Sequence, residues 1–315
     1  MSMTETIKLY DRDAYATEFE ADIISCEPNK ADDKQFDIIL NQTLFFPEEG
    51  GQSPDMGILG GYKVVDVQIK NGVITHTVDI SADDCCIMGK EEAQTEKTTD
   101  GQIIGMECVS EKVELAAGVH VHGKIDWQHR FYNMQQHSGE HIFSGIVHRR
   151  FGFENVGFHL SDSVVTMDFS GVISPEDIAE VEHEVNVAIS KNIPIEVTYP
   201  SRDELAQLEY RSKIEIEGQV RIVTVPGYDV CACCAPHVKR TGEIGMLKVM
   251  NYQNYKGGVR ISILCGFRAL EAFRQKCDII SELMGIFTTN QEAIVDNVTK
   301  LKAVNQSLKS ELGTA

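Results

Sequence analysis

The chain has 315 residues, of which 42% are hydrophobic and 24% are charged. This composition is typical of a soluble globular protein, and the length favours two or three domains. The formal net charge is −19, so no overall field draws a polyanion to the protein. Any binding of nucleic acid must use local basic groups. Three such groups occur: Arg149–Arg150, Lys239–Arg240, and Lys256 with Arg260.

The sequence carries no signal for a membrane or for export. It lacks a run of about 18 uninterrupted apolar residues, which a membrane-spanning helix needs. The first residues are polar and mixed in charge, without the basic start and apolar stretch of a secretory leader. We therefore expect a cytoplasmic protein that does not enter a membrane.

Residues 1–126 have the pattern of β-structure. Short apolar runs alternate with turn signals, and Lys70-Asn71-Gly72-Val73 followed by alternating apolar residues is typical of a two-residue β-hairpin. A polar stretch from about Gly89 to Gly101 indicates a surface insertion. We expect this segment to form a small β-barrel.

Residues 127–265 have the pattern of a mixed α+β domain. The apolar period changes at Trp127 and predicts a long helix through Ile146. Ser174-Pro175 predicts a helix start, and Ser201 with Glu204 predicts a capping box. Strands are expected at four places: Val164–Phe169, Val220–Val225, Gly245–Met250 and Val259–Leu264.

Residues 266–315 predict a helical coiled coil. From Leu270 to Leu312, mostly apolar residues recur in unbroken steps of three and four. A helix packed back on the α+β domain is the alternative. Gln291 and Asn305 are polar residues at seam positions, and such residues commonly fix the register of a coiled coil. We therefore expect a homodimer formed through this tail.

Two pairs of residues have the spacing of a metal site. His137 and His141 stand four residues apart in a predicted helix, so both imidazoles lie on one face. Cys233 and His237 repeat this interval, and Pro236 indicates that a loop rather than a helix presents them. Three imidazoles and a thiolate form a ligand set that zinc favours.

The cysteines favour a metal site over disulfides. Nine cysteines is an odd number, and in a chain without a secretory leader clustered cysteines are more often metal ligands or buried thiols. Cys231 and Cys234 are rivals of Cys233 as the ligand, and the spacing does not exclude Cys234.

Two further motifs suggest chemistry. His137-Ser138-Gly139-Glu140-His141 also fits the H-x-x-E-H pattern of a metalloprotease, in which the Glu is the general base. That interpretation requires a downstream carboxylate as third ligand and leaves the Cys/His pair unexplained. Gly50-Gly51-Gln52 is a tripeptide that can place a backbone and an amide beside an aminoacyl ester, although a β-turn explains it equally.

Several stretches, in chain order, resemble the alanyl-tRNA editing proteins, free-standing relatives of the editing domain of alanyl-tRNA synthetase. The similarity runs from about residue 35 to residue 268. The stretches that carry it are Leu40–Pro47, Gly50-Gly51-Gln52, Asp55-Met56-Gly57, Ile125-Asp126-Trp127, Met134–His141, Gly157-Phe158-His159-Leu160, Val220–Val223, His237–Gly245 and Lys256–Arg260.

The resemblance implies a barrel like those of translation factors over 1–126, a zinc-dependent editing domain over 127–265, and a zinc ion as cofactor. It places the family's metal ligands on His137/His141 and Cys233/His237, which favours Cys233 over Cys234. The polar residue of the family's amino-acid pocket falls at Asn155 or Val156, and only Asn155 can hydrogen-bond through its side chain. We also expect three contacts with the tRNA acceptor end: His159, Lys239 and Arg240.

The function implied by the resemblance is hydrolysis of mischarged alanine-specific tRNA carrying serine or glycine. Two roles of zinc stay open. In the first, zinc activates the attacking water. In the second, it organises the pocket and holds the substrate's amino group. Glu140 is the candidate general base and Gln52 a second candidate catalytic residue. Family members commonly read Cys-Gly-Gly-Thr-His where this chain reads Cys-Cys-Ala-Pro-His. Because of this difference, the alternative function is that of a non-catalytic adaptor that binds tRNA.

Overall fold

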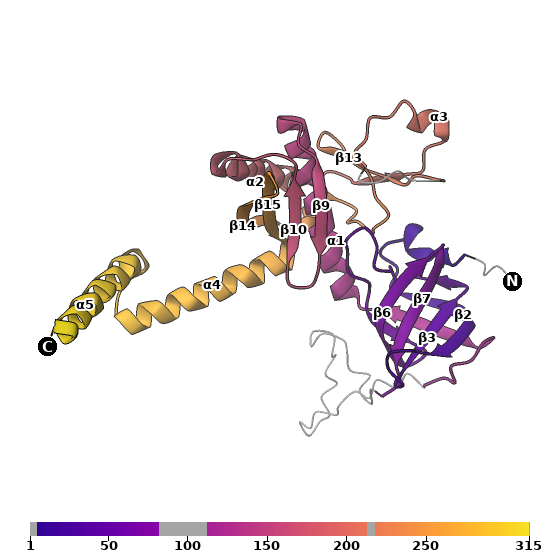
Figure 1. The fold of residues 1–315 in the computed structure, drawn as a ribbon. Helices are drawn as coiled ribbons and strands as arrows, with labels where there is room; N and C mark the ends of the chain where they lie inside the picture. Colours follow the sequence, from indigo (N-terminus) through magenta and orange to yellow (C-terminus); the bar gives the residue numbers. More distant parts are fainter. Residues whose placement is uncertain (1–4, 82–111, 213–217, 315) are drawn as a thin grey trace, which may run out of the picture. The chain divides into compact units, whose positions relative to one another are not determined.

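The computed structural model describes residues 5–81, 112–212 and 218–314, which combine strands and helices as expected for an α+β protein (Figure 1). The chain forms two compact units, residues 1–266 and 267–315. The expected boundary between residues 126 and 127 lies inside the first unit and stays a prediction. The insertion expected at residues 89–101 lies outside the described residues. No helix in the described part of the chain has the length and apolarity to span a bilayer.

Six strands in the N-terminal part of the first unit pair in a closed order. The order is β2-β3-β7-β6-β5-β8, and β8 closes the sheet because it pairs with both β2 and β5. The strands are β2 (Glu18–Pro28), β3 (Gln35–Leu40), β5 (Gly57–Leu59), β6 (Tyr62–Lys70), β7 (Val73–Asp79) and β8 (His120–Ile125). A short parallel pair, β1 (Ile7–Lys8) and β4 (Gln42–Thr43), flanks them, and a single 3-10 turn, η1 (Leu9–Asp11), follows β1.

The predicted hairpin is confirmed. β6 and β7 are joined at Asn71 and Gly72, whose φ angles are 52° and 76°. Positive φ at both central residues is the mark of a type I′ turn, whose twist matches that of the strands, and Asn-Gly is its preferred sequence.

The second half of the first unit is the α+β part. A four-stranded antiparallel sheet has the order β14-β15-β10-β9, and a smaller one has the order β11-β12-β13. The helices α1 and α2 contact each other, and α1 packs on β9 and β15 while α2 packs on β14 (Figure 1). The bounds are α1 (Trp127–Phe151), β9 (Asn155–Leu160), β10 (Val165–Phe169), α2 (Pro175–Ser190), β11 (Glu196–Thr198), α3 (Arg202–Leu205), β12 (Ile222–Val225), β13 (Asp229–Ala232), η2 (Thr241–Ile244), β14 (Leu247–Tyr255) and β15 (Gly258–Cys265).

The predicted helix starts are confirmed by their caps. Ser174 accepts a hydrogen bond from the Asp177 amide at the start of α2, and Ser201 with Glu204 forms the expected capping box of α3. Such caps satisfy amide groups that have no partner within the helix. The strands β9, β11 and β13 were not predicted.

A buried ion pair ties α1 to the barrel. Arg130 of α1 and Asp55 of the barrel are both fully buried. The Arg130 Nε atom lies 2.9 Å from each Asp55 oxygen, and Nη2 also donates to Asp55 and to the Leu44 carbonyl. Because this pair joins the first turns of α1 to the barrel, it fixes where the middle of α1 lies.

The second unit corrects one expectation. Instead of one continuous helix from Leu270 to Leu312, the chain forms α4 (Gly266–Phe287), a 3-10 turn η3 (Gln291–Ala293) and α5 (Ile294–Thr314). Thr288 has a φ of 48°, which ends α4, and the Asn290 side chain caps the next turn by accepting from the Ala293 amide. A left-handed residue followed by a capping residue therefore interrupts the helical tail, and its pairing as a coiled coil stays a prediction.

Candidate metal centre

The four predicted ligands converge on one point. His137 and His141 lie one turn apart in the buried middle of α1. Cys233 and His237 lie on the loop that follows β13. Arg221 stabilises this loop, because its Nη1 atom donates to the carbonyls of Cys233 and Ala235 at 2.8 and 2.9 Å.

The spacing of the ligand atoms fits zinc. One ligand atom from each of His137, His141, Cys233 and His237 lies within 4.8 Å of the others. Cys233 Sγ is 3.3 Å from His237 Nε2 and 3.7 Å from His137 Nε2. In a tetrahedral site with Zn–N bonds of about 2.1 Å and a Zn–S bond of about 2.3 Å, neighbouring ligand atoms stand about 3.3–3.7 Å apart. The two distances from Cys233 Sγ therefore suit a zinc ion, and the other ligand atoms lie close enough to complete the set.

Each of the three histidines is oriented through its other ring nitrogen. His137 Nδ1 is 2.8 Å from Gln52 Oε1, and His141 Nδ1 is 2.9 Å from Asp229 Oδ2. His237 Nδ1 is 3.0 Å from the hydroxyl of Ser138. With Nδ1 engaged in this way, Nε2 is the nitrogen left to bind metal, which is the usual arrangement around a metal-bound imidazole.

The charge state of the three neighbouring thiols favours Cys233 as the ligand. Burial raises the pKa of Cys233, but the nearby His137 and His237 outweigh it and hold that pKa well below its usual value. Burial raises the pKa of Cys231 to about 11, and burial together with the Cys233 charge raises that of Cys234. Since the thiolate is the form that binds metal, Cys233 is the thiol prepared for it. Burial also lowers the pKa of His237 to about 3.

Two buried residues of the site were not predicted. Asp229, which orients His141, receives two hydrogen bonds from Arg211, with Nε–Oδ1 at 2.7 Å and Nη2–Oδ2 at 2.9 Å. Burial raises the pKa of Asp229, yet the hydrogen bonds from His141 and Arg211 outweigh it and lower that pKa below its usual value. Among 48 acidic residues, nothing in the local sequence distinguishes Asp229. Only the fold brings it to His141.

The glycine pair brings Gln52 to the metal ligands. Gly50 and Gly51 have φ angles of 63° and 86°, a region that suits glycine. A Cβ on Gly51 would stand 2.4 Å from the Phe158 carbonyl oxygen, so the turn lies directly against β9. Gln52 is fully buried, and its Nε2 atom has no hydrogen-bond partner among the described residues. This predicted catalytic residue therefore contacts a metal ligand through Oε1 and keeps two amide hydrogens for another group.

Glu140 and Asn155 contact each other. Asn155 Nδ2 donates to Glu140 Oε1 at 2.6 Å, and the Ser144 hydroxyl donates to the same oxygen at 2.7 Å. Both residues are buried. The H-x-x-E-H interpretation needs a downstream carboxylate as third ligand, but the described residues complete the set with Cys233 and His237. The metalloprotease interpretation leaves Cys233 and His237 unexplained, so it stays the alternative.

The other expected substrate contacts lie outside the ligand set. His159 is exposed on β9. Lys239 stacks its ammonium group 4.2 Å from the centre of the Tyr15 ring, and Arg240 donates to the carbonyl of Asn192. The structure therefore leaves the substrate roles of these three residues as predictions.

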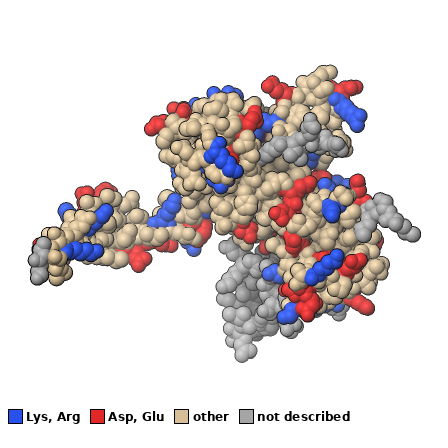
Figure 2. All heavy atoms as spheres, in the orientation of Figure 1, with Lys and Arg blue, Asp and Glu red and all other residues tan. Residues whose placement is uncertain are grey.

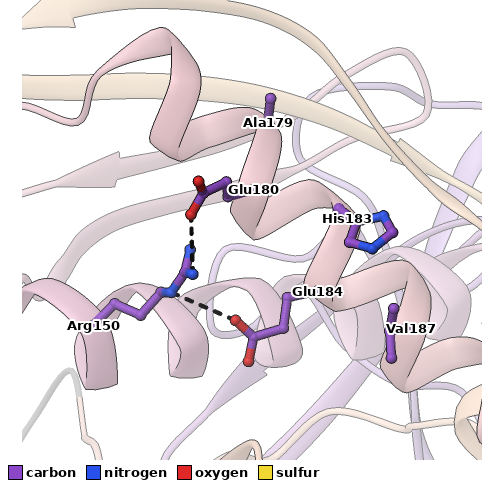
Figure 3. Close-up of a pocket in the computed structure, with 6 residues that line it drawn as sticks. All are labelled: Arg150, Ala179, Glu180, His183, Glu184 and Val187. Atoms are coloured by element: carbon purple, nitrogen blue, oxygen red, sulfur yellow. Dashed lines mark hydrogen bonds and ion pairs between the residues drawn. The ribbon is translucent and has the colours of Figure 1, made fainter.

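The basic group at the end of α1 is neutralised by carboxylates. Arg150 pairs with Glu180 and Glu184 of α2, and Arg149 also pairs with Glu184. Figure 3 shows Arg150 turned toward these glutamates at an open cavity of about 530 Å³ that contains no metal ligand. On the face drawn in Figure 2, acidic side chains stand among the basic ones over the barrel. No extended basic surface is visible on that face.

The comparisons with known proteins agree with this geometry. The profile described as "Threonyl and Alanyl tRNA synthetase second additional domain" matches residues 220–262, which include Cys233 and His237. The alanyl-tRNA editing protein AlaX-L of Pyrococcus horikoshii is 26% identical over 97% of this chain and 69% of its own length. The alanyl-tRNA editing protein Aarsd1 of Danio rerio is 27% identical over 96% of this chain and 69% of its own.

The chain is therefore similar to the alanyl-tRNA editing proteins over almost its whole length. It is also similar to the alanine–tRNA ligase of Ignicoccus hospitalis, at 26% identity over 96% of this chain but 31% of the ligase. The similarity therefore covers only part of the ligase. These similarities and the four converging side chains together define the site to which a function can be assigned.

Proposed function

We propose that this protein hydrolyses the ester bond of alanine-specific tRNA that carries serine or glycine, acting as a free-standing editing enzyme in the cytoplasm. The observation that carries the proposal is the buried set of three imidazoles and one thiol beside Gln52, in a chain whose relatives are named alanyl-tRNA editing proteins. The substrate pair follows from chemistry. A pocket built for alanine excludes the smaller glycine poorly and rejects an added hydroxyl only modestly, so a second hydrolytic site restores accuracy.

His137, His141, Cys233 and His237 would hold the zinc ion. Held by these four side chains, zinc would supply a positive charge and would fix their positions relative to one another. Gln52 orients His137 through Oε1, and its Nε2 amide is a donor directed at no other described group. We assign this amide to an oxygen of the aminoacyl ester, because a buried donor is stabilised by gaining a partner.

Access to this site is consistent with a large substrate. Cys233 is partly exposed, whereas the three histidines are buried. Gly50 and Gly51 are also exposed, and Gly50 lies beside the Cys234 sulfur, at 3.8 Å from an ideal Cβ. The aminoacyl end of a tRNA would therefore approach between the glycine turn and the Cys233–Cys234 loop. Asn155 is the proposed contact for the amino acid, and His159, Lys239 and Arg240 are the proposed contacts for the acceptor end.

A deacylation assay tests this function. We expect the protein to release serine and glycine from alanine-specific tRNA and to leave alanine attached. Cys233→Ala should abolish zinc binding and hydrolysis together, whereas Cys231→Ala should change neither, since the pKa of the Cys231 thiol is raised. Binding of the charged tRNA without release of any amino acid would establish the adaptor in place of the enzyme.

The basic residues need a separate measurement. Lys239→Glu with Arg240→Glu should weaken tRNA binding without altering zinc content, and the affinity of the wild type should fall with salt at a slope of a few phosphate contacts. Unchanged tRNA affinity in the double variant would show that the acceptor end contacts other residues.

A further inference from the structure

Two sets of metal-binding atoms overlap at His141. The first is the set already described. The second consists of His141, Asp229 and Cys231, whose ligand atoms also lie within 4.8 Å of one another, and all three residues are buried. An imidazole, a carboxylate and a thiol are each ordinary ligands of zinc. The protein therefore needs a feature that decides which set takes the ion.

Arg211 is that feature. Its guanidinium occupies both oxygens of Asp229, at 2.7 and 2.9 Å, and its side chain is only 9% exposed. The backbone of Arg211 is fixed to β13 on both sides, since its amide donates to the Val230 carbonyl and its carbonyl accepts from the Ala232 amide, both at 2.9 Å. A guanidinium keeps its charge in proteins. A divalent cation on Asp229 would therefore have a positive charge beside it in a buried site.

Arg211 also fixes the direction in which His141 binds. With both Asp229 oxygens held, Oδ2 is positioned to accept from His141 Nδ1. This hydrogen bond leaves Nε2 facing Cys233 and the first set. The same residue thus repels a cation from the second set and presents His141 to the first.

We propose that Arg211 is a positioning residue that confines the metal to the set of His137, His141, Cys233 and His237, and that removing its charge opens a second metal site made of His141, Asp229 and Cys231. In that variant His141 Nδ1 and the Cys231 thiol each release a proton to solvent, so that the His141 ring bridges the two ions as an imidazolate and Cys231 binds as the thiolate. The ligand class of this second site is a divalent transition metal such as zinc or cobalt. The inference rests on the metal centre of the proposed function and adds a determinant of where its ion binds.

Titration of the metal-free protein with Co²⁺ tests the proposal, because cobalt–thiolate bonds give charge-transfer absorption in proportion to their number. The wild type should bind one Co²⁺ per chain with the signal of one thiolate. Arg211→Met should show the signal of a second thiolate, and adding Cys231→Ser to Arg211→Met should remove that increment. Cys231→Ser alone should leave the wild-type spectrum unchanged.

The matched control is Arg260→Met. Arg260 also donates to both oxygens of one aspartate, Asp168, at 2.6 Å each, but this pair joins β15 to β10 and contains no metal ligand. Its loss should leave the cobalt spectrum and stoichiometry as in the wild type. A change equal to that of Arg211→Met would overturn the proposal, because the effect would then follow from losing any such pair.

The outcomes are distinguishable. A wild type that binds no Co²⁺ would remove the metal centre of the proposed function. If the wild type binds one Co²⁺ and Arg211→Met still shows the signal of one thiolate, the inference about Arg211 is overturned, while the metal centre of the proposed function stands. Should Arg211→Met fail to fold, Arg211→Lys decides, because lysine keeps the charge but cannot hold both oxygens. We expect it to bind one Co²⁺ about 10–100-fold more weakly, and unchanged affinity would count against the inference.

Discussion

Helix α1 and the C-terminal helices α4 and α5 differ in which side chains they bury and which they expose. The middle of α1 is buried although much of it is polar, whereas α4 and α5 expose apolar residues. The buried polar residues of α1 are Arg130, Asn133, Gln135, Gln136, His137, Ser138, Glu140, His141 and Ser144. The large apolar residues exposed on α4 and α5 are Phe267, Leu270, Phe273, Ile279, Ile286, Val295, Val298, Leu301, Val304, Leu308 and Leu312.

The difference shows that apolar periodicity does not by itself tell which face of a helix is buried. In α1 burial is possible because the polar groups are hydrogen-bonded. Gln136, for example, exchanges two hydrogen bonds with the backbone of Cys265, at 2.7 and 2.9 Å. Such pairing offsets the cost of removing polar groups from water. An exposed apolar face of this length is instead typical of a surface that binds another chain.

The largest effect should come from the apolar face of α5. We propose a homodimer through residues 267–315, and Leu301→Lys with Leu308→Lys should convert it to a monomer, because both leucines are more than half exposed on one helix face. Sedimentation of the full chain is the measurement. Lys302→Gln with Lys309→Gln is the control and should leave the dimer intact. A wild type that sediments as a monomer at micromolar concentration would refute this pairing.

The second-largest effect should come from the buried ion pair between Asp55 and Arg130. Asp55→Ala should lower the free energy of unfolding by about 3–5 kcal/mol, because it leaves the fully buried Arg130 without its partner. Chemical denaturation measures the loss. Lys248→Ala is the control, since Lys248 pairs with Glu182 while half exposed, and such pairs contribute about 0–1 kcal/mol. Equal losses in the two variants would show that burial of the ion pair does not matter here.

Features set by neighbouring residues were predictable from the sequence. The hairpin at Asn71-Gly72, the caps at Ser174 and Ser201, and the start of α1 near Trp127 all follow from local signals, whereas α1 continues past the predicted Ile146 to Phe151. The two ligand pairs were also found, because their four-residue interval is local within each pair. The break at Thr288 was not predicted, since the apolar periodicity continues across it while the capping by Asn290 competes with the helix.

Features set by contacts between distant segments were not predictable. Gln52 reaches His137 across 85 positions of the sequence, and Asp229 reaches His141 across 88. Arg211 and Asp229 meet only because residue 211 lies beside β13. Carboxylates and amides are common, so spacing cannot single out the ones that orient a ligand. The resemblance to a family favoured Cys233 over Cys234 as a ligand, but it did not supply these partners.

A smaller effect should follow from removing the partner of His137. Gln52→Ala should weaken zinc binding about 10–100-fold, because the ring loses the acceptor that holds Nδ1. Competition with a chelator measures this. Gln68→Ala is the control, since Gln68 is exposed and donates to Glu48 at the barrel surface. An unchanged zinc affinity in Gln52→Ala would show that Gln52 does not support zinc binding, and would leave only its proposed contact with the substrate.

The smallest effect should come from Glu140→Gln. A general base normally contributes about 10²–10⁴-fold to the rate, so its loss would nearly abolish hydrolysis. Glu140 Oε1, however, accepts from both Asn155 and Ser144, and the amide oxygen of glutamine can accept the same two bonds. We therefore expect deacylation within about tenfold of the wild type, whereas Glu140→Leu, which removes the acceptor, should reduce it further by releasing Asn155. A loss of 100-fold or more in Glu140→Gln, with zinc content and stability unchanged, would instead identify Glu140 as the base and place the reacting water beside α1.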